Sequence, residues 1–305
     1  MMMLQAPKSV VMIRPHHFHP NPETKADNSF QSDGAGTRDT IAKTAREEFD
    51  TAVNLLRDAG VVVHDFDDTS DQTPDSVFPN NWFSTHAGGH VAIYPMYAKT
   101  RRLERRWDVI ELLKRDYRVQ DVIDYSGLEQ DNLALEGTGA MVLDHIGRVA
   151  YVARSNRADP VLLERFCTNF NFEPIAFDAR DKNGLDVYHT NVLMTVATDF
   201  ALVALDMITQ SERRKTVRDR LIESDHDVIA LSEYQIGEFC GNAFEMSGRT
   251  GRILAISARG LNALEPSQIK TIEKSVQIVP LNIPTIETAG GSVRCMIAGI
   301  HLAKR

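Results

Sequence analysis

Residues 138–177 read TGAMVLDHIGRVAYVARSNRADPVLLERFCTNFNFEPIAF, and this stretch decides the fold. Its apolar runs at 138–143 and 149–153 predict two strands. Pro160 then opens an amphipathic pattern that predicts a helix over residues 160–167, and the run at 174–177 predicts a third strand. The stretch is therefore one ββαβ unit, in which a single helix follows a pair of strands.

The same order of elements returns along the rest of the chain. The chain begins with a strand at 9–14, a helix at 38–59 and a strand at 61–66, and it ends with a strand at 293–300. Helix centres recur about every 55 residues, the period of a repeated supersecondary unit. We therefore expect one α/β domain over residues 1–305, with five units around a centre and strand ends that converge on a common pocket. The remaining units are expected at strands 82–84, 91–94 and 119–123 with helix 101–114, at strands 192–196, 200–205 and 227–230 with helix 212–221, and at strands 243–246, 253–256 and 276–280 with helix 266–274.

Composition and missing motifs exclude several classes of function. The net charge of −8 argues against a nucleic-acid binder, which needs a basic face for phosphates. No apolar stretch is long enough to span a membrane, and the first residues lack the apolar run of a signal peptide. Three cysteines, far apart and without CxxC spacing, indicate neither a disulfide framework nor a zinc site. We expect a cytoplasmic protein with no membrane or nucleic-acid partner.

A polar loop at residues 16–37 is too long for a plain connector, so we expect a lid or a binding loop. Its histidines at 16, 17 and 19 lie in a Pro-rich segment whose spacing does not indicate a metal site. A basic run at residues 101–106 has helical spacing and is expected to be mostly solvated.

Three short segments carry side chains that could act as a general acid, a general base or a nucleophile. Two glycines precede Cys295, so the backbone can turn sharply and project the thiol into a cleft. A buried apolar thiol is the competing interpretation, and it fits Cys167 and Cys240 better. His189 is expected at the mouth of a strand. Glu136, beside a Gly-rich strand entrance, needs a partner if it is buried, and His189 could supply it.

Two further features could bind a polar group. Asn191 follows His189 by two residues, which places both on the same face of a strand. In residues 73–82, TPDSVFPNNW, Pro79 starts a turn and the two asparagines offer paired donors and acceptors to a planar group. A simple Asn-rich turn is the alternative.

Together and in this order, the segments FPNNWF (78–83), LEGTG (135–139), YHTN (188–191) and GGSVRC (290–295) resemble the guanidino-group-modifying superfamily, also called amidinotransferase-like or pentein. The resemblance covers essentially the whole chain and implies a five-bladed α/β propeller with pseudo-fivefold symmetry. Within that superfamily the chain is most similar to citrulline-utilisation hydrolases, which convert citrulline to ornithine, carbon dioxide and ammonia.

The resemblance assigns Cys295 as the nucleophile, His189 as the general acid and base, and Glu136 as the carboxylate that partners the histidine. It implies a covalent intermediate on the cysteine and no metal or organic cofactor. The expected partner is a small amino-acid substrate, and a homodimer is the expected form of any self-association.

The resemblance also places the substrate-binding residues. Asp75, Asn81 and Asn191 fall where the family holds the amino end and the planar terminal group of the substrate. Either asparagine could also donate to the oxyanion that forms during the reaction. Arg157 matches the SxR arginine that binds the substrate carboxylate, and Arg101 is a second such arginine.

The chain departs from the arginine-handling branches at two of these positions, where they have carboxylates and it has Asn81 and Asn191. A guanidinium offers only donors and is matched by carboxylates, whereas a neutral ureido group presents an acceptor and donors, as asparagine does. Both replacements therefore favour a ureido substrate. The alternatives are a deiminase or dihydrolase of arginine type, an amidinotransferase that passes the fragment to an amine, and a non-enzymatic repeat scaffold.

Overall fold

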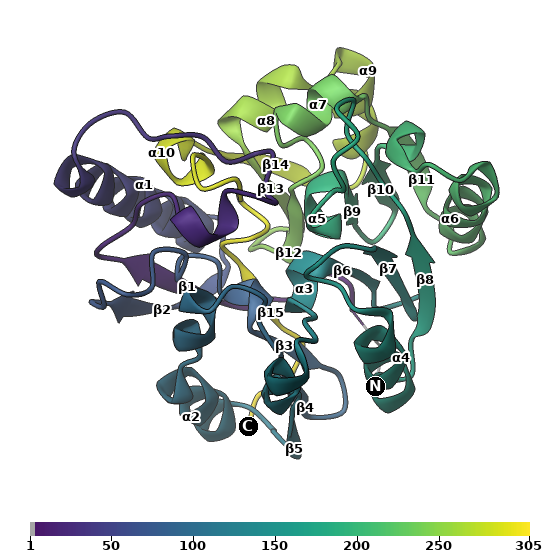
Figure 1. Ribbon diagram of the computed structural model, residues 1–305. Helices are drawn as coiled ribbons and strands as arrows, with labels where there is room; N and C mark the ends of the chain where they lie inside the picture. Colours follow the sequence, from purple (N-terminus) through teal and green to yellow (C-terminus); the bar gives the residue numbers. More distant parts are fainter. Residues whose placement is uncertain (1–3) are drawn as a thin grey trace.

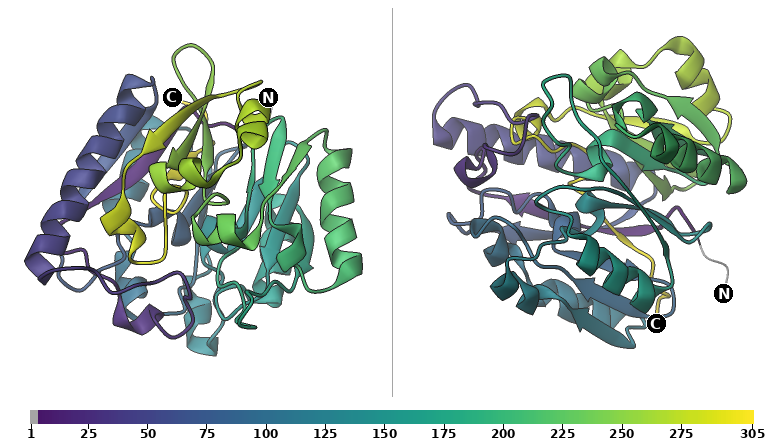
Figure 2. Two further views of the ribbon diagram at one scale, coloured as in Figure 1. Left: turned by 90° about the horizontal axis from the view of Figure 1, so that it is seen from above. Right: turned by 45° about the vertical axis from the view of Figure 1, so that its right-hand side comes forward.

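The computed structural model describes residues 4–305, so the first three residues of the stretch considered for a signal peptide lie outside it. It has five sheets of three strands each, arranged around a common centre with the longer helices outside (Figures 1 and 2). The predicted five-bladed α/β propeller of ββαβ units is therefore confirmed.

The blade from the opening stretch illustrates the local rules. β6 (Met141–Asp144) pairs antiparallel with β7 (Val149–Ala153), and β7 pairs parallel with β8 (Glu173–Phe177). The crossover helix α4 (Pro160–Phe170) begins where the Asp159 side chain accepts hydrogen bonds from two free backbone N–H groups. It ends at Asn171, whose φ of 54° lies in the left-handed region.

Three more blades repeat this order, and each buries one face of its sheet beneath its helices. Their apolar side chains form contiguous clusters between blades. The blades comprise β3 (Phe83–His86), β4 (His90–Ile93), α2 (Trp107–Asp116) and β5 (Asp121–Asp124); β9 (Met194–Val196), β10 (Phe200–Val203), α6 (Ser211–Glu223) and β11 (Asp227–Ala230); and β12 (Phe244–Ser247), β13 (Arg252–Ser257), α8 (Ala258–Ala263), α9 (Pro266–Ile272) and β14 (Gln277–Leu281).

The fifth blade joins the two ends of the chain. β1 (Ser9–Pro15) pairs parallel with β2 (Val62–Asp68) through the crossover helix α1 (Arg38–Asp58), as predicted. Gly60 ends that connection with a φ of 97°, which a residue with a side chain rarely adopts. The third strand, β15 (Ala298–Ile300), comes from the end of the chain and pairs antiparallel with β1, so Ser9 faces Ile300. The last strand thereby closes the ring.

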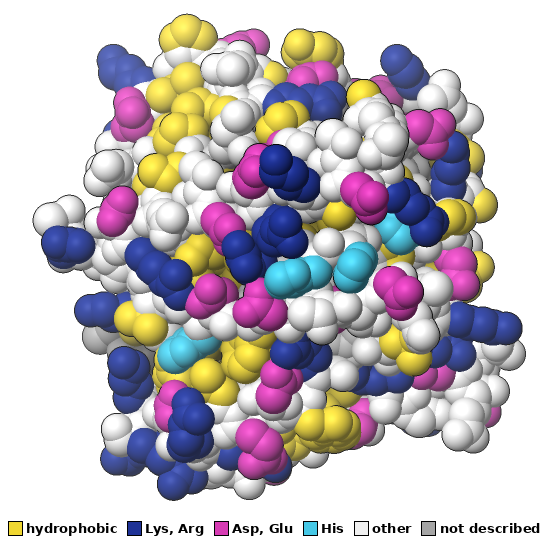
Figure 3. Space-filling view, turned by 90° about the vertical axis from the view of Figure 1, so that its left-hand side faces the viewer, with side chains coloured by type: hydrophobic (Ala, Val, Ile, Leu, Met, Phe, Trp, Pro, Cys, Tyr) yellow, Lys and Arg dark blue, Asp and Glu magenta, His cyan; other side chains and the backbone are white. Residues whose placement is uncertain are grey.

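Figure 3 shows the flank formed by the fifth blade, on which Lys and Arg are interspersed with Asp and Glu. Ion pairs account for part of this mixture, since Arg14 contacts Asp50 of α1. Among residues 4–305, no helix is both long and apolar enough to cross a membrane.

Four local predictions were wrong, and all lie at the inner ends of the blades. Residues 137–140 form a helical turn, α3, rather than the start of a strand. His189 caps another such turn, α5 (Thr190–Leu193), before β9 begins. Cys295 lies in a turn that precedes β15. The helix expected at 101–114 is broken into a 3-10 helix at residues 100–104 and α2, because Arg101 turns inward and is buried while Arg106 is extended.

Candidate active site

All eight residues singled out in the sequence come together at the inner ends of the blades. Six of them line one cavity, and Glu136 and Asn191 join it through hydrogen bonds to His189 and Cys295. The space left in this cavity is about 10 Å³, roughly what one water molecule needs. Its lining also includes Gly291, one of the two glycines before Cys295, and residues that the sequence did not single out: Thr24, Asn28, Phe78, Tyr188 and Ala289.

Cys295 is held in its turn by its backbone N–H, which donates to the Ser292 carbonyl at 3.0 Å. Gly290 has a φ of 81°, and a side chain on Gly291 would stand 2.9 Å from the Phe78 ring. The two glycines therefore serve the sharp turn and close approach that the sequence indicated. The thiol itself is 2% exposed.

Two amide groups donate to the sulfur of Cys295. Asn191 Nδ2 lies 3.2 Å from Sγ, and Asn242 Nδ2 lies 3.3 Å from it. Asn242 was missed, because it appeared only as a neighbour of Cys240 in a segment interpreted as structural. Two neutral donors at the sulfur can stabilise a thiolate, or an oxyanion that forms beside it.

His189 and Glu136 form the predicted pair, with Nε2 of the imidazole 2.8 Å from a Glu136 oxygen. The other oxygen of Glu136 accepts a hydrogen bond from the Tyr97 N–H at 3.0 Å. Burial disfavours the charge on Glu136, but Arg157, the hydrogen bond of His189 and Arg101 together lower its pKa to about 2. Burial lowers the pKa of His189 to about 4, although Glu136 favours the protonated ring. At neutral pH the pair is thus a carboxylate beside a neutral imidazole whose Nδ1 is left for chemistry.

Gly139 makes room for this arrangement. A Cβ atom there would stand 2.8 Å from His189 Nδ1 and would overlap the side-chain amide of Asn81. The backbone of Gly139 is not in the left-handed region, so the requirement is for space alone. Glycine is therefore required at residue 139 for packing against His189 and Asn81, which the alternation of a strand did not indicate.

Arg101, 2% exposed, lies among acidic and amide groups. Its Nε and Nη2 both donate to Glu104 at 2.9 Å, and its guanidinium is 3.5 Å from Glu136 and 3.8 Å from Asp75. The Asn81 amide oxygen accepts from it at 2.9 and 3.0 Å. The prediction of a solvated residue here was wrong, and a carboxylate-binding role for Arg101 stays a prediction.

Asp75 is buried, with Oδ2 accepting from Asn21 at 2.9 Å and Oδ1 without a partner in the described part of the chain. Burial raises its pKa, while Arg101 opposes that shift. A buried carboxylate oxygen without a donor is suited to a cationic group such as an α-ammonium.

Arg157, also 2% exposed, follows β7, and its role in binding a substrate carboxylate stays a prediction. Its guanidinium lies 4.8 Å from the ring centroid of Tyr188 and 3.8 Å from Glu136. Nε and Nη2 donate to Asp27 of the 16–37 loop, at 3.1 and 2.5 Å. The loop thus reaches into the site, as expected of a lid or binding loop.

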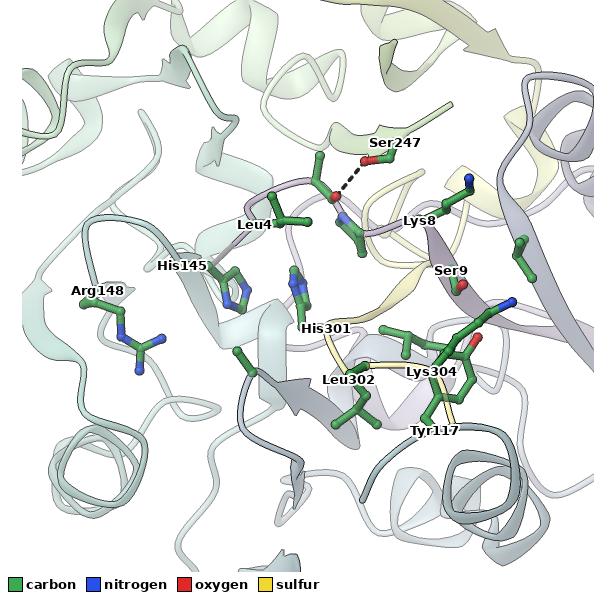
Figure 4. Close-up of a pocket in the computed structure, with 16 residues that line it drawn as sticks. Leu4, Lys8, Ser9, Tyr117, His145, Arg148, Ser247, His301, Leu302 and Lys304 are labelled. Carbon is green, nitrogen blue, oxygen red and sulfur yellow. Dashed lines mark hydrogen bonds between the residues drawn. The ribbon is translucent and has the colours of Figure 1, made fainter. Parts of the chain in front are cut away.

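A larger cavity, of about 510 Å³, lies at the far ends of the same strands (Figure 4). It is lined by Lys8, Arg148 and Lys304 and by the stacked rings of His145 and His301, 3.8 Å apart. Its lining holds no cysteine and no carboxylate. None of the eight residues singled out in the sequence lines this larger cavity.

Comparison with known proteins agrees with the fold. A sequence model described as N,N dimethylarginine dimethylhydrolase, eukaryotic, matches residues 14–302. A search of curated proteins finds no match.

Solved structures of the same fold include the N-terminal domain of ArgZ, an arginine dihydrolase from cyanobacteria, bound to its substrate. That domain has a TM-score of 0.72 and 16% identity, over 96% of this chain and 97% of that one. AgrE with ornithine and NAD+ has a TM-score of 0.74 and 17% identity, over 97% of this chain but only 40% of that one. A dimethylarginine dimethylaminohydrolase adduct has a TM-score of 0.65 and 12% identity, over 96% and 99%.

Proposed function

The chain belongs to the N,N dimethylarginine dimethylhydrolase family, within the guanidino-group-modifying superfamily, and we propose that it hydrolyses the C–N bonds of a ureido amino acid, converting citrulline and water to ornithine, carbon dioxide and ammonia. Residues 1–305 would act as one catalytic domain, with Cys295 as nucleophile, His189 as acid and base, and Glu136 as its partner.

The observation that carries the choice of substrate is the set of groups around the sulfur. Both side chains within hydrogen-bond distance of it, Asn191 and Asn242, are neutral amides. The buried carboxylate of Glu136 is already bound to His189 and lies within 4 Å of two arginines.

A substrate guanidinium would be a third cation next to Arg101 and Arg157, and the unpartnered carboxylate oxygen in the lining, on Asp75, is the one we assign to the α-ammonium group. A neutral ureido group adds no charge and can accept from the amides of the asparagines. The charge balance of the pocket therefore supports a ureido substrate.

In the proposed reaction, the thiol proton of Cys295 passes to Nδ1 of His189, and the thiolate attacks the ureido carbon. Asn191 and Asn242 would then stabilise the negative oxygen of the tetrahedral intermediate. When the C–N bond breaks, His189 returns its proton to the leaving ammonia, and an N-alkyl thiocarbamate remains on the sulfur. Water, activated by His189, displaces the sulfur, and the resulting carbamic acid separates into ornithine and carbon dioxide.

The α-ammonium and α-carboxylate groups of the substrate would bind to other residues that line the same cavity. Asp75 would accept from the α-ammonium group with its unpartnered oxygen, and Arg157 would bind the α-carboxylate. Both side chains are buried, so each contact would be made away from water.

Arginine is the second candidate, because relatives of the same fold include an arginine dihydrolase bound to its substrate. Product analysis separates the two. The protein is incubated with citrulline and with arginine in separate reactions, and ornithine, citrulline and ammonia are quantified. Ornithine from citrulline supports the proposal, whereas turnover of arginine alone contradicts it. Added glycine tests the amidinotransferase alternative, since a new guanidino product would require transfer to an amine.

A further inference from the structure

The carboxylate of Asp27 takes the place on Arg157 that a substrate carboxylate would need. A guanidinium binds a carboxylate best through one edge that offers two parallel N–H groups. On Arg157 the edge formed by Nε and Nη2 is occupied by both oxygens of Asp27. The remaining nitrogen, Nη1, faces Glu136. Arg157 therefore has no free edge for a ligand while the loop is in this position.

The burial of Arg157 explains why the loop carboxylate is there. A guanidinium that is 2% exposed has lost nearly all of its water, and Glu136, 3.8 Å away, is shared with His189 and Arg101. Asp27 is 21% exposed and comes from a loop, so it can leave more easily than a residue of the blades. Asp27 supplies the negative charge that Arg157 needs when no substrate carboxylate is bound.

The same loop also fills the cavity. Thr24 and Asn28, on either side of Asp27, line it, and Asn28 Nδ2 donates to the Ala289 carbonyl at 3.2 Å. With about 10 Å³ left, an amino acid cannot enter unless this segment moves. Any such movement pulls Asp27 away from Arg157, so loop opening and release of the arginine are one event.

We propose that Asp27 competes with the substrate's carboxylate for Arg157 and is exchanged for it when substrate binds. One carboxylate replaces another, so the buried arginine is paired in both the free and the bound states. This rests on the proposed function only in taking the ligand to be an amino acid with a free carboxylate. Asp27 is then a residue that sets the affinity for substrate, although it touches no reacting atom.

The test is the binding of ornithine, measured by calorimetry, to the wild type, Asp27→Asn and Asp33→Asn. Asp33 is the matched control, because it lies in the same loop but is exposed and paired only with Lys25. Without the competitor, Asp27→Asn should bind ornithine at least about tenfold more tightly. Asp33→Asn should match the wild type. If Asp27 instead held Arg157 in place for the substrate, Asp27→Asn would bind more weakly, and weaker or unchanged binding overturns the proposal.

A double-mutant cycle with Arg157→Gln separates competition from a general loosening of the loop. In the Arg157→Gln background, Asp27→Asn should no longer tighten ornithine binding, because the contested guanidinium is gone. A gain of the same size in both backgrounds would contradict the exchange. Hydrogen exchange of residues 23–31 should rise in free Asp27→Asn and stay unchanged in Asp33→Asn. Because no turnover is measured, these results stand even if the substrate proves to be arginine.

Discussion

The side-chain nitrogen of Asn242 lies 3.3 Å from the sulfur of Cys295 and also donates to the Asn191 carbonyl at 2.9 Å. Its oxygen accepts from the Arg294 N–H at 2.9 Å, so both ends of the amide are fixed. One asparagine thus links the nucleophile to the segment that carries the second amide donor.

Replacing Asn242 by alanine should make the thiolate of Cys295 less stable. The loss of one donor to the sulfur, or to the oxyanion that forms beside it, is expected to lower kcat by roughly 10- to 100-fold. The measurements are steady-state kinetics and the rate of Cys295 alkylation by iodoacetamide, followed by mass spectrometry. An Asn242→Ala variant with the wild-type kcat and the wild-type alkylation rate would remove Asn242 from the site.

Cys295 should be the preferred target of an alkylating reagent. Burial raises the pKa of both Cys167 and Cys240 to about 12, so these thiols are expected to react slowly. Cys295→Ser should lose turnover by about 1,000-fold or more while keeping its thermal stability. Cys240→Ser, which can keep its hydrogen bond to Gly260, is the control that should remain active. Equal labelling of all three cysteines would argue against Cys295 as nucleophile.

Gly139→Ala tests the packing beneath the imidazole. The added methyl group would press on His189 Nδ1 and Asn81, so kcat should fall by about tenfold or more. Gly127→Ala is matched to it, since nothing lies within 4 Å of the position and its φ is ordinary. Steady-state kinetics of both variants provide the measurement. Equal kcat values for Gly139→Ala and Gly127→Ala would contradict the packing requirement at residue 139.

Stability should fall as the pH is lowered from about 6.5 to 4. Burial lowers the pKa of His189 and His301 each to about 4, from 6.5, and also holds the pKa of His86 and His145 well below the ordinary value. Below pH 6.5 the unfolded chain therefore binds protons that the folded chain does not, which favours unfolding. For His189, 1% exposed, the loss is on the order of 2–3 kcal/mol.

Urea titrations at pH 7.5, 5.5 and 4.5 measure this dependence. Glu136 adds to the loss below about pH 4.5, because its pKa in the folded chain is about 2. His301→Gln should flatten the decline, since it removes one of the rings with a lowered pKa from a cluster away from Cys295. An unfolding free energy that is the same at pH 4.5 and pH 7.5 would contradict the expectation.

The blades were predictable because each has a helix between its second and third strands and clear turns between the elements. The helix α1 illustrates this, since Ala45, Phe49 and Leu56 recur on its buried face as the sequence pattern requires. The segments that hold His189 and Cys295 were not predictable in the same way. They are single turns stabilised by contacts between blades, and a few residues carry too little periodicity to show their geometry.

The members of the candidate site could be selected by motif, but their pairwise contacts could not. Asn242 and Asp27 were missed because each acts on a residue more than 50 positions away in the sequence. Asn81 lines the cavity as expected of a substrate-binding residue, but the contact of its oxygen with Arg101 was not foreseen. Such contacts depend on how five blades meet, which local patterns do not encode.

The pairing of β15 with β1 has a consequence for the order in which activity can appear. Cys295 lies three residues before the strand that joins the two ends of the chain, so its position depends on that strand being docked. During refolding, the other blades can form without producing a competent thiol. Recovery of turnover should therefore indicate that β15 has paired with β1. It should lag behind the recovery of helical circular dichroism.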